Sequence, residues 1–236
     1  TFLFDLEGND SYSNACYSNG SFSFLFDLKG NDAYYNQTCV SYNNGTSFFI
    51  DFSGNDIYNG KNFTQSFSSN GVAILVDIFG DDIYTSYSYS QSSSINGFSA
   101  LIDFYGKDIF YSSDRSQSFA DGFTSFSLFI NLFGDDFYTA GNYSQGYANG
   151  GSAIFFDFNG DDGYEAMHYS QSSSVFGMTV FLDSEGKNNF YHGLFCQGKK
   201  IGGFALFMNT FEINEEFFEV IQHLESNIWK FLSYFF

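Results

Sequence analysis

The sequence predicts an all-β fold, a β-solenoid (parallel β-helix), from three observations. One signature recurs eight times along the 236 residues: apolar residues, Asp, an apolar residue, any residue, Gly, Asn/Asp/Lys, Asp, any residue, and Tyr or Phe. Its copies are spaced by 22, 24, 26, 26, 28, 26 and 26 residues. They are rich in aromatic and β-branched residues, contain no proline and show no helical periodicity, which is typical of strands separated by glycine turns.

Each repeat is expected to form one coil, so about eight coils of roughly 26 residues cover residues 1–212. The signature supplies one strand and a turn, and a more polar segment, such as YSYSQSSS, supplies a second strand and turn. Neighbouring strands lie about 4.8 Å apart, so the body is expected to be roughly 40 Å long, with equivalent residues stacked in ladders. The turn glycines are Gly8, Gly30, Gly54, Gly80, Gly106, Gly134, Gly160 and Gly186.

The pattern changes after Glu212, and an amphipathic helix is predicted over 213–236. Asn214 can cap it, and acidic residues follow in its first turn. We expect this helix either to cap the last coil edge or to dock on a neighbouring subunit. Its apolar residues recur at helical spacing: Phe217, Val220, Ile221, Leu224, Ile228, Phe231 and Phe235.

Composition excludes several classes of partner. The formal net charge is −19, and Arg115 is the only arginine, so no basic surface can neutralise the phosphates of a nucleic acid or an anionic membrane. The longest apolar stretch, 217–236, contains too many polar residues for a membrane span. Aromatic residues make up 23% of the chain and charged residues only 15%, which excludes intrinsic disorder.

Two acidic ladders follow from the repeat. One residue stands three positions before each turn glycine: Asp5, Asp27, Asp51, Asp77, Asp103, Asn131, Asp157 and Asp183. Another stands two positions after it: Asp10, Asp32, Asp56, Asp82, Asp108, Asp136, Asp162 and Asn188. Charges about 5 Å apart repel by about 3 kcal/mol at an effective dielectric constant near 20, so both ladders need neutralisation or hydrogen-bond donors.

Calcium is one solution, because it takes carboxylate and carbonyl oxygens and could bridge adjacent coils. The candidate ligands are the aspartates of both ladders from Asp5 to Asp162. The alternative is that each first Asp accepts hydrogen bonds from its own turn, as in an Asx turn, while each second Asp points to water. The turns with Gly-Asn-Asp or Gly-Asp-Asp, as at Gly30 and Gly80, resemble the calcium-binding repeats of secreted RTX (repeat-in-toxin) proteins, and this resemblance implies calcium binding.

An apolar stripe is expected on the outside of the rod, on the same face as the first acidic ladder. Such a stripe would pack laterally against another subunit. The alternative is that the C-terminal helix covers it, or that the strand faces the other way. The residues are Leu3, Leu25, Phe49, Leu75, Leu101, Phe129, Phe155 and Phe181.

A glutamine ladder is expected on the opposite side, where stacked amides hydrogen-bond along the rod. A flat array of Ser, Gln and Tyr could also bind a glycan. Cys16 and Cys39 occupy corresponding places in adjacent coils, so a disulfide between them is possible, with free buried thiols as the alternative. The glutamines are Gln65, Gln91, Gln117, Gln145, Gln171 and Gln197.

No catalytic constellation is found, since His168, His192 and His223 do not repeat with the coils and the carboxylates are periodic. The chain is therefore expected not to be an enzyme. We expect a structural subunit of an extracellular assembly, such as a sheath, filament, surface layer or adhesin stalk, built by self-association. The alternative is a calcium-dependent carbohydrate-binding or polysaccharide lyase-like domain.

Overall fold

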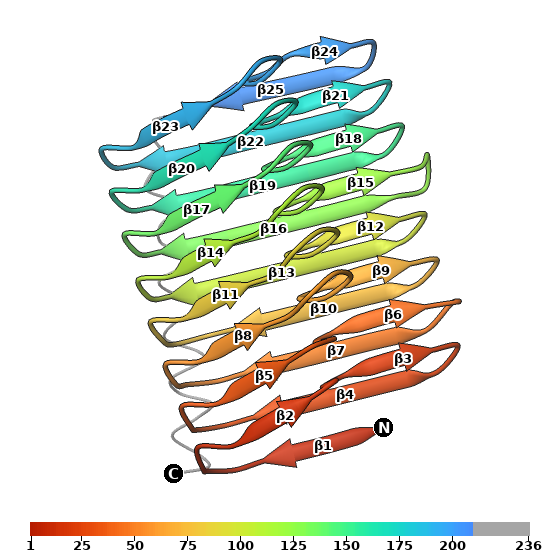
Figure 1. Cartoon of the computed structure of the whole chain (residues 1–236), viewed down its shortest axis with the longest axis vertical. Coiled ribbons are helices and arrows are strands. Elements are labelled where there is room, and N and C mark those ends of the chain that lie inside the picture. The colour runs from red at the N-terminus through yellow and green to blue at the C-terminus, as the bar shows by residue number, and fades with distance from the viewer. Residues whose placement is uncertain (210–236) are drawn as a thin grey trace, which may run out of the picture.

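The computed structural model describes residues 1–209, which form a parallel β-solenoid of eight coils and a final strand (Figure 1). The predicted fold class is confirmed. The expectation of two strands per coil is wrong, because each coil contains three strands that stack into three parallel sheets. The predicted helix over 213–236 lies outside the described residues.

A nine-stranded sheet forms one side of the rod and contains the apolar strand of each signature. Its strands are parallel and in register, so that Asp27 pairs with Asp51 and Asp51 with Asp77. The sheet contains β1 (Phe2–Asp5), β4 (Phe22–Asp27), β7 (Thr46–Asp51), β10 (Val72–Asp77), β13 (Phe98–Tyr105), β16 (Phe126–Phe133), β19 (Ser152–Asn159), β22 (Met178–Glu185) and β25 (Phe204–Met208).

Two eight-stranded sheets of short strands complete each coil. The first follows the turn glycine and contains β2 (Ser11–Ser13), β5 (Ala33–Tyr35), β8 (Ile57–Asn59), β11 (Ile83–Thr85), β14 (Ile109–Tyr111), β17 (Phe137–Ala140), β20 (Gly163–Ala166) and β23 (Asn189–His192). The second contains β3 (Tyr17–Asn19), β6 (Val40–Tyr42), β9 (Phe67–Ser69), β12 (Ser93–Ile95), β15 (Phe119–Asp121), β18 (Tyr147–Asn149), β21 (Ser173–Val175) and β24 (Lys200–Ile201).

The turn glycine is required by the close approach of successive coils. A Cβ atom built on Gly54 would lie 1.7 Å from the carbonyl oxygen of Gly30 in the preceding coil, and one built on Gly80 would lie 1.8 Å from that of Gly54. Any side chain here would separate the coils and break the ladder hydrogen bonds. The same clash is found for the seven turn glycines from Gly30 to Gly186, which explains why the glycine recurs in these copies of the signature.

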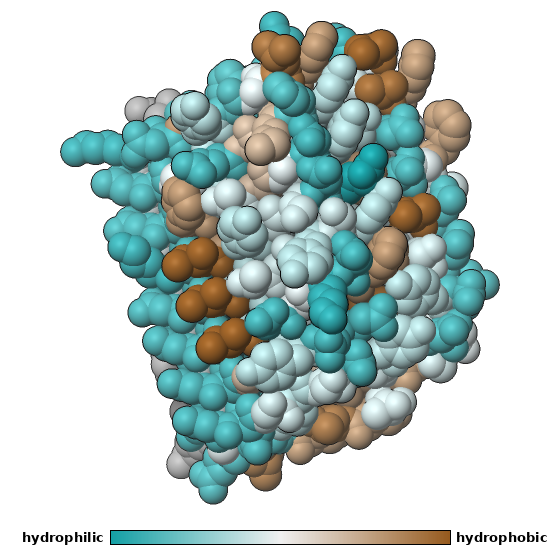
Figure 2. Space-filling view, in the orientation of Figure 1, coloured by the Kyte–Doolittle hydropathy of each residue, from teal (hydrophilic) through white to brown (hydrophobic). Residues whose placement is uncertain are grey.

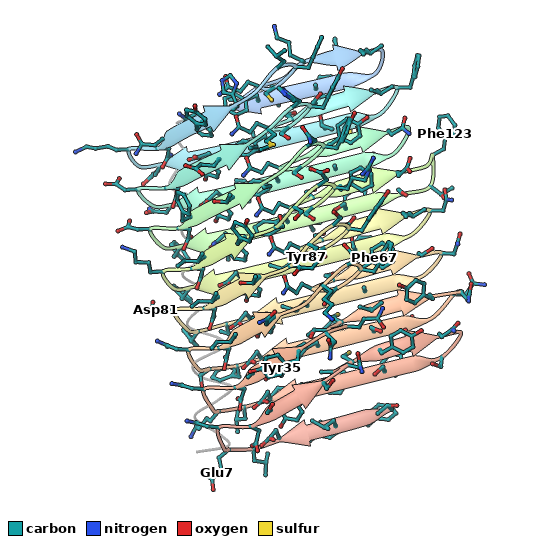
Figure 3. The ribbon with its side chains drawn as sticks, viewed as in Figure 1. Glu7, Tyr35, Phe67, Asp81, Tyr87 and Phe123 are labelled. Carbon is teal, nitrogen blue, oxygen red and sulfur yellow. The ribbon has the colours of Figure 1, made fainter. Side chains whose placement is uncertain are left out.

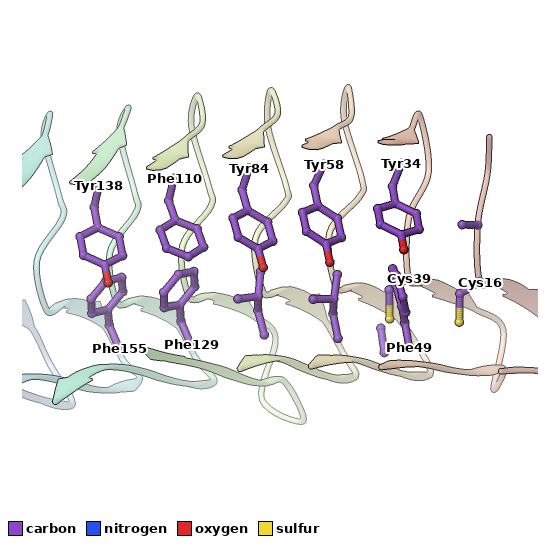
Figure 4. Close-up of a cluster of buried hydrophobic side chains, with 14 of the residues drawn as sticks. Cys16, Tyr34, Cys39, Phe49, Tyr58, Tyr84, Phe110, Phe129, Tyr138 and Phe155 are labelled. Carbon is purple, nitrogen blue, oxygen red and sulfur yellow. The ribbon is translucent and has the colours of Figure 1, made fainter. Parts of the chain in front are cut away.

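The core is a set of stacked columns inside the rod (Figure 4). One column consists of rings from the first eight-stranded sheet, with Tyr58 and Tyr84 parallel at 4.4 Å between centroids. Rings from the nine-stranded sheet face it edge-on, as between Phe110 and Phe129 at 5.0 Å. Face-to-face contact along the rod and edge-to-face contact across it are both favourable arrangements for aromatic rings.

The expected outer stripe is wrong in its orientation, because its side chains form part of this core. Phe49, Leu75 and Phe155 are fully buried, and Leu3 packs against the cluster from the first coil. The stripe does share a face with the first acidic ladder, as expected. That face points inward, since the aspartates of the ladder are buried as well. The residues concerned are Leu3, Leu25, Phe49, Leu75, Leu101, Phe129, Phe155 and Phe181.

Candidate metal centre

The two acidic ladders meet at one edge of the rod, where the chain leaves the nine-stranded sheet and turns into the first eight-stranded sheet. Asp81, beside the turn glycine Gly80, marks this edge in Figure 3. We call the ladder at the strand ends the inner row (Asp5, Asp27, Asp51, Asp77, Asp103, Asn131, Asp157 and Asp183). We call the ladder after the glycine the turn row (Asp10, Asp32, Asp56, Asp82, Asp108, Asp136, Asp162 and Asn188). Together they form the acidic corner.

Tyrosine hydroxyl groups link neighbours of the inner row. The Tyr58 hydroxyl lies 3.1 Å from Asp51 Oδ2 and 2.6 Å from Asp77 Oδ2, and Tyr84 makes the same pair of contacts with Asp77 and Asp103, at 3.0 and 2.9 Å. A hydroxyl carries one proton, so it donates to only one of its two carboxylates at a time. Each bridge therefore leaves the pair of carboxylates short of one donor.

The turn row is bonded to the backbone of the neighbouring coil. The amide N–H of Asp56 donates to Asp82 Oδ1 at 2.6 Å, and that of Asp82 donates to Asp108 Oδ1 at 2.8 Å. These aspartates are buried, with Asp56 1% and Asp82 0% exposed. The alternative in which each second Asp points to water is therefore wrong for these coils. It holds only at the open first coil, where Asp10 is exposed.

The second oxygen of most of these carboxylates has no hydrogen-bond partner, although it is buried. Three groups of carboxylates bring oxygen atoms within 4.8 Å of one another: Asp51 with Asp56 and Asp77, Asp77 with Asp82 and Asp103, and Asp136 with Asp157 and Asp162. The unpartnered oxygens are Oδ1 of Asp27, Asp51, Asp77, Asp103 and Asp157, and Oδ2 of Asp32, Asp56, Asp82, Asp108, Asp162 and Asp183.

The electrostatics of the corner oppose ionisation. Burial, with the charges of neighbouring aspartates, raises the pKa of Asp56 to about 8 and that of Asp82 to about 11. The same two causes raise the pKa of Asp51 and Asp103 well above the ordinary value. At neutral pH, a buried carboxylate in this corner must therefore either be protonated or contact a cation.

The carboxylate groups fit a calcium ion. Calcium takes six to eight oxygen ligands at about 2.3–2.6 Å, so ligands on opposite sides of the ion lie about 5 Å apart. Each of the three groups brings one oxygen from each of its carboxylates within 4.8 Å of the others, close enough for one calcium ion to contact all three. The smaller magnesium ion requires about 2.1 Å and keeps several waters, which a buried corner does not accommodate well. Asp77 belongs to two of the groups, so successive ions would share it.

The structure brings together most of the predicted ligands, and it also shows a partner of the inner row whose role the repeat pattern did not reveal, a tyrosine hydroxyl. A tyrosine stands seven residues after most inner-row aspartates, as Tyr34 does after Asp27 and Tyr58 after Asp51, and a phenylalanine stands there after Asp103 and Asp183. The spacing was visible in the repeat, yet only the stacking of coils shows that the hydroxyl also reaches the next aspartate. At the first coil, Tyr12 donates to Asp5 alone.

The glutamine ladder lies inside the rod, at the turn into the second eight-stranded sheet. Gln117 Nε2 donates to Gln91 Oε1 at 3.0 Å, and Gln145 Nε2 donates to Gln117 Oε1 at 3.1 Å. The predicted amide hydrogen bonds along the rod are thus confirmed at these steps. Because Gln65 to Gln171 are fully buried, these side chains form no outer surface that a glycan could contact.

All three cysteines are buried free thiols. Cys16 and Cys39 do occupy adjacent coils, as expected, since the amide of Val40 donates to the carbonyl oxygen of Cys16. Their thiols donate to backbone carbonyl oxygens, of Phe48 and Ile74 respectively, rather than forming the disulfide that the sequence analysis allowed. Burial raises the pKa of the Cys39 thiol well above its ordinary value, which keeps it protonated.

No family model, curated protein or solved structure matches the chain. Over the described residues 1–209, the structure contains no helix long and apolar enough to cross a membrane. The function is therefore argued from the geometry of the acidic corner and the surface of the rod.

Proposed function

We propose that the chain is a structural rod whose acidic corner binds a row of calcium ions between successive coils, and that it serves as a building block of an extracellular assembly. One observation carries the proposal: three groups of buried carboxylates from adjacent coils bring oxygen atoms within 4.8 Å of one another, and seven of these eight carboxylates also have a buried oxygen without a partner. The ions would neutralise the two rows and supply the positive charge that the chain lacks.

Protons alone are a weaker solution for the same rows. The second oxygens without partners belong to eleven aspartates, and to give each of these aspartates a proton at neutral pH would require a pKa above 7 at every position. Burial raises the pKa of Asp77 and Asp157 only to about 6, because tyrosine hydroxyls stabilise their charged forms. These two carboxylates therefore hold a proton less readily than Asp56 or Asp82, and a divalent cation offsets their charge better than a partial set of protons.

The proposed extracellular location follows from the calcium concentration that such sites require. Sites of extracellular modules typically bind calcium with dissociation constants of about 10⁻⁴–10⁻³ M, which millimolar calcium outside cells saturates. The periodic corner also argues against a lyase or another carbohydrate-active enzyme. Similar carboxylate groups recur in several coils, whereas an active site would break the repeat at one place.

Self-association has a candidate surface on the first eight-stranded sheet. Ile57, Ile83, Ile109 and Phe137 lie one coil apart and are 41–44% exposed. Figure 2 shows this apolar row down the face of the rod, over β8, β11 and β14. A second copy carries the same row at the same spacing, so two rods side by side could bury it along their length. We therefore propose this exposed row as the surface for self-association, because the apolar stripe predicted from the sequence lies in the core.

The test is the solution mass of the chain, measured by light scattering in millimolar calcium and again after chelation. The proposal predicts a species larger than the 26.6 kDa chain in calcium. A double variant, Ile83→Ser with Ile109→Ser, should reduce that mass while leaving the calcium-dependent rise in melting temperature unchanged. A monomer in both conditions would overturn the assembly, and an unchanged mass in the double variant would exclude this surface.

A further inference from the structure

Each coil places one inner-row residue against the turn-row residue five positions later. In six of the eight coils both members are aspartates, and in coil four Asp77 and Asp82 belong to one group of carboxylates with oxygen atoms within 4.8 Å of one another. Two carboxylates cannot hydrogen-bond to each other unless a proton or cation joins them. The pair is thus the smallest unit of the acidic corner that needs a positive charge.

Two coils replace one carboxylate of the pair by an amide. In coil six, Asn131 Nδ2 donates to Asp136 Oδ2 at 2.7 Å. In coil eight, Asn188 Nδ2 donates to Asp183 Oδ1 at 2.5 Å. The replacement falls in the inner row in one case and in the turn row in the other, but the result is the same amide–carboxylate hydrogen bond.

The asparagine amide donates to a carboxylate oxygen that has no hydrogen-bond partner in the equivalent aspartates of most other coils. In Asp56, Asp82 and Asp108 the buried Oδ2 is without a partner, whereas in Asp136 the same atom accepts from Asn131. A neutral amide also halves the charge of the pair. In coil six, the side chain of Asn131 therefore provides what a cation would provide in coil four: a partner for the carboxylate oxygen and a smaller negative charge on the pair.

A second change accompanies Asn131. The tyrosine hydroxyl that links inner-row neighbours is missing at the preceding coil, where Phe110 stacks between Tyr84 and Tyr138 at 4.5 and 5.1 Å. Tyr84 bridges Asp77 to Asp103, but no hydroxyl at Phe110 joins Asp103 to Asn131. The linked series of carboxylates is interrupted at this step by two independent replacements.

We infer that Asn131 and Asn188 act as built-in substitutes for a divalent cation, so that coils with an Asp–Asp pair bind calcium at the pair while coils six and eight do not. The inference rests on the proposed calcium binding and names which coils take part. The row of ions is divided by coil six, and Asp157 with Asp162 in coil seven forms a separate group that also draws on Asp136.

The test counts calcium ions per chain by native mass spectrometry at saturating calcium. Asn131→Asp should bind one ion more than the unsubstituted chain, because it restores an Asp–Asp pair. Asn59→Asp is the matched control: it adds the same charge at an exposed position on the first eight-stranded sheet and should leave the count unchanged. An unchanged count in Asn131→Asp would overturn the inference.

Asp82→Asn keeps the test decisive if Asn131→Asp fails to fold. It places an amide opposite Asp77 and so creates an aspartate–asparagine pair of the kind that coil eight already contains. This variant should therefore fold and bind one ion fewer, and an undiminished count would contradict the inference. If the unsubstituted chain binds no calcium at all, the proposed function itself fails, and that result differs from the loss of the predicted differences between variants.

Discussion

The acidic corner and the glutamine ladder solve the same packing problem with different chemistry. Both are rows of polar side chains that repeat once per coil and are buried inside the rod. The Nε2 of Gln65, Gln91, Gln117 and Gln145 lies within hydrogen-bond distance of two backbone carbonyl oxygens, one in its own coil and one in the next. At Gln117 and Gln145 its two hydrogens are shared among these oxygens and the Oε1 of the preceding glutamine. Most of the buried carboxylates have a hydrogen-bond partner for one oxygen and lack one for the other, and the buried Oε1 of Gln65, Gln145 and Gln171 also lacks a partner.

The difference lies in what the side chains can offer each other. An amide contains both a donor and an acceptor, so neighbouring amides can hydrogen-bond to each other, as Gln117 does with Gln91 and Gln145 with Gln117. An ionised carboxylate only accepts, and identical carboxylates repel. Unpartnered amide oxygens, as in Gln65, Gln145 and Gln171, cost a hydrogen bond but no charge repulsion, whereas stacked carboxylates need positive charge from outside the row.

The largest expected effect is a pH dependence of the metal-free protein. Burial raises the pKa of Asp108 and Asp162 to about 8 in the folded state, against an ordinary value near 4 in the unfolded chain. Folded protein thus binds more protons between pH 4 and 8, and its free energy of unfolding falls as the pH rises through that window. Each such carboxyl group contributes a slope of up to about 1.4 kcal/mol per pH unit.

The measurement is urea unfolding in the presence of a chelator at pH 5 and pH 8. We expect lower stability at pH 8, and calcium should remove most of the difference. The glutamine ladder has no group that titrates in this range, so it contributes nothing to the slope. Equal stability at both pH values without calcium would contradict the electrostatic account of the corner.

A carboxylate placed in the glutamine ladder should be strongly destabilising. Gln91→Glu puts an acceptor-only group at a fully buried position where Nε2 now donates to the carbonyl oxygens of Tyr84 and Tyr111, at 3.0 and 3.1 Å. We expect a loss of about 3 kcal/mol or more, which calcium does not restore. Denaturant unfolding measures it.

Thr85→Glu is the control for this change. Its position pairs along the sheet with the column in which coil seven naturally carries Glu165, a residue exposed to solvent. That variant should change stability by less than about 0.5 kcal/mol. A similar loss in both variants would mean that added charge, rather than the missing donor, causes the effect.

The reverse substitution, an amide placed in the acidic corner, should change the stability of the protein in opposite directions with and without calcium. Asp51→Asn introduces a donor into a row of acceptors and removes a ligand from the group with Asp56 and Asp77. After chelation the variant should be more stable than the parent chain, and in calcium less stable, by about 2 kcal/mol in each case. Melting temperatures in both conditions check this prediction; a shift of the same sign in both would exclude it.

The smallest effect is expected for the tyrosine bridge. Tyr58→Phe removes the hydroxyl between Asp51 and Asp77 but retains the ring, and Phe110 shows that phenylalanine fits this column. A loss of about 1 kcal/mol is expected from the missing hydrogen bond. Thermal unfolding of this variant, compared with Tyr35→Phe on the exposed side of β5, isolates the buried hydroxyl. Equal stability of the two variants would show that the tyrosine bridge does not stabilise the fold.

The repeat alone predicted the solenoid, the number of coils and the two acidic rows, because turn glycines and aspartates at fixed offsets survive changes in loop length. It did not predict which face of the long strand points inward. Strands such as 22–27 are apolar on both faces, so alternation could not orient them. The orientation follows from the buried contact between Asp27 and Tyr34, which joins two different sheets.

The third strand of each coil was missed for a related reason. The segments Ile57–Asn59 and Ile83–Thr85 are only three residues long, too short for a periodic pattern to stand out. Likewise, the role of Asn131 is invisible in one copy of the signature. It emerges only when the amide is seen against Asp136 and compared with the equivalent pairs of other coils.

The most direct test of the central claim is the melting temperature of the chain, freed of metal by chelation and then measured against added calcium at pH 7.5. A ligand bound only by the folded state stabilises by about 2.7 kcal/mol per site at one hundred times its dissociation constant, and several sites act together here. We predict a large, saturable rise with calcium and a much smaller one with magnesium. A melting temperature indifferent to calcium would contradict the account.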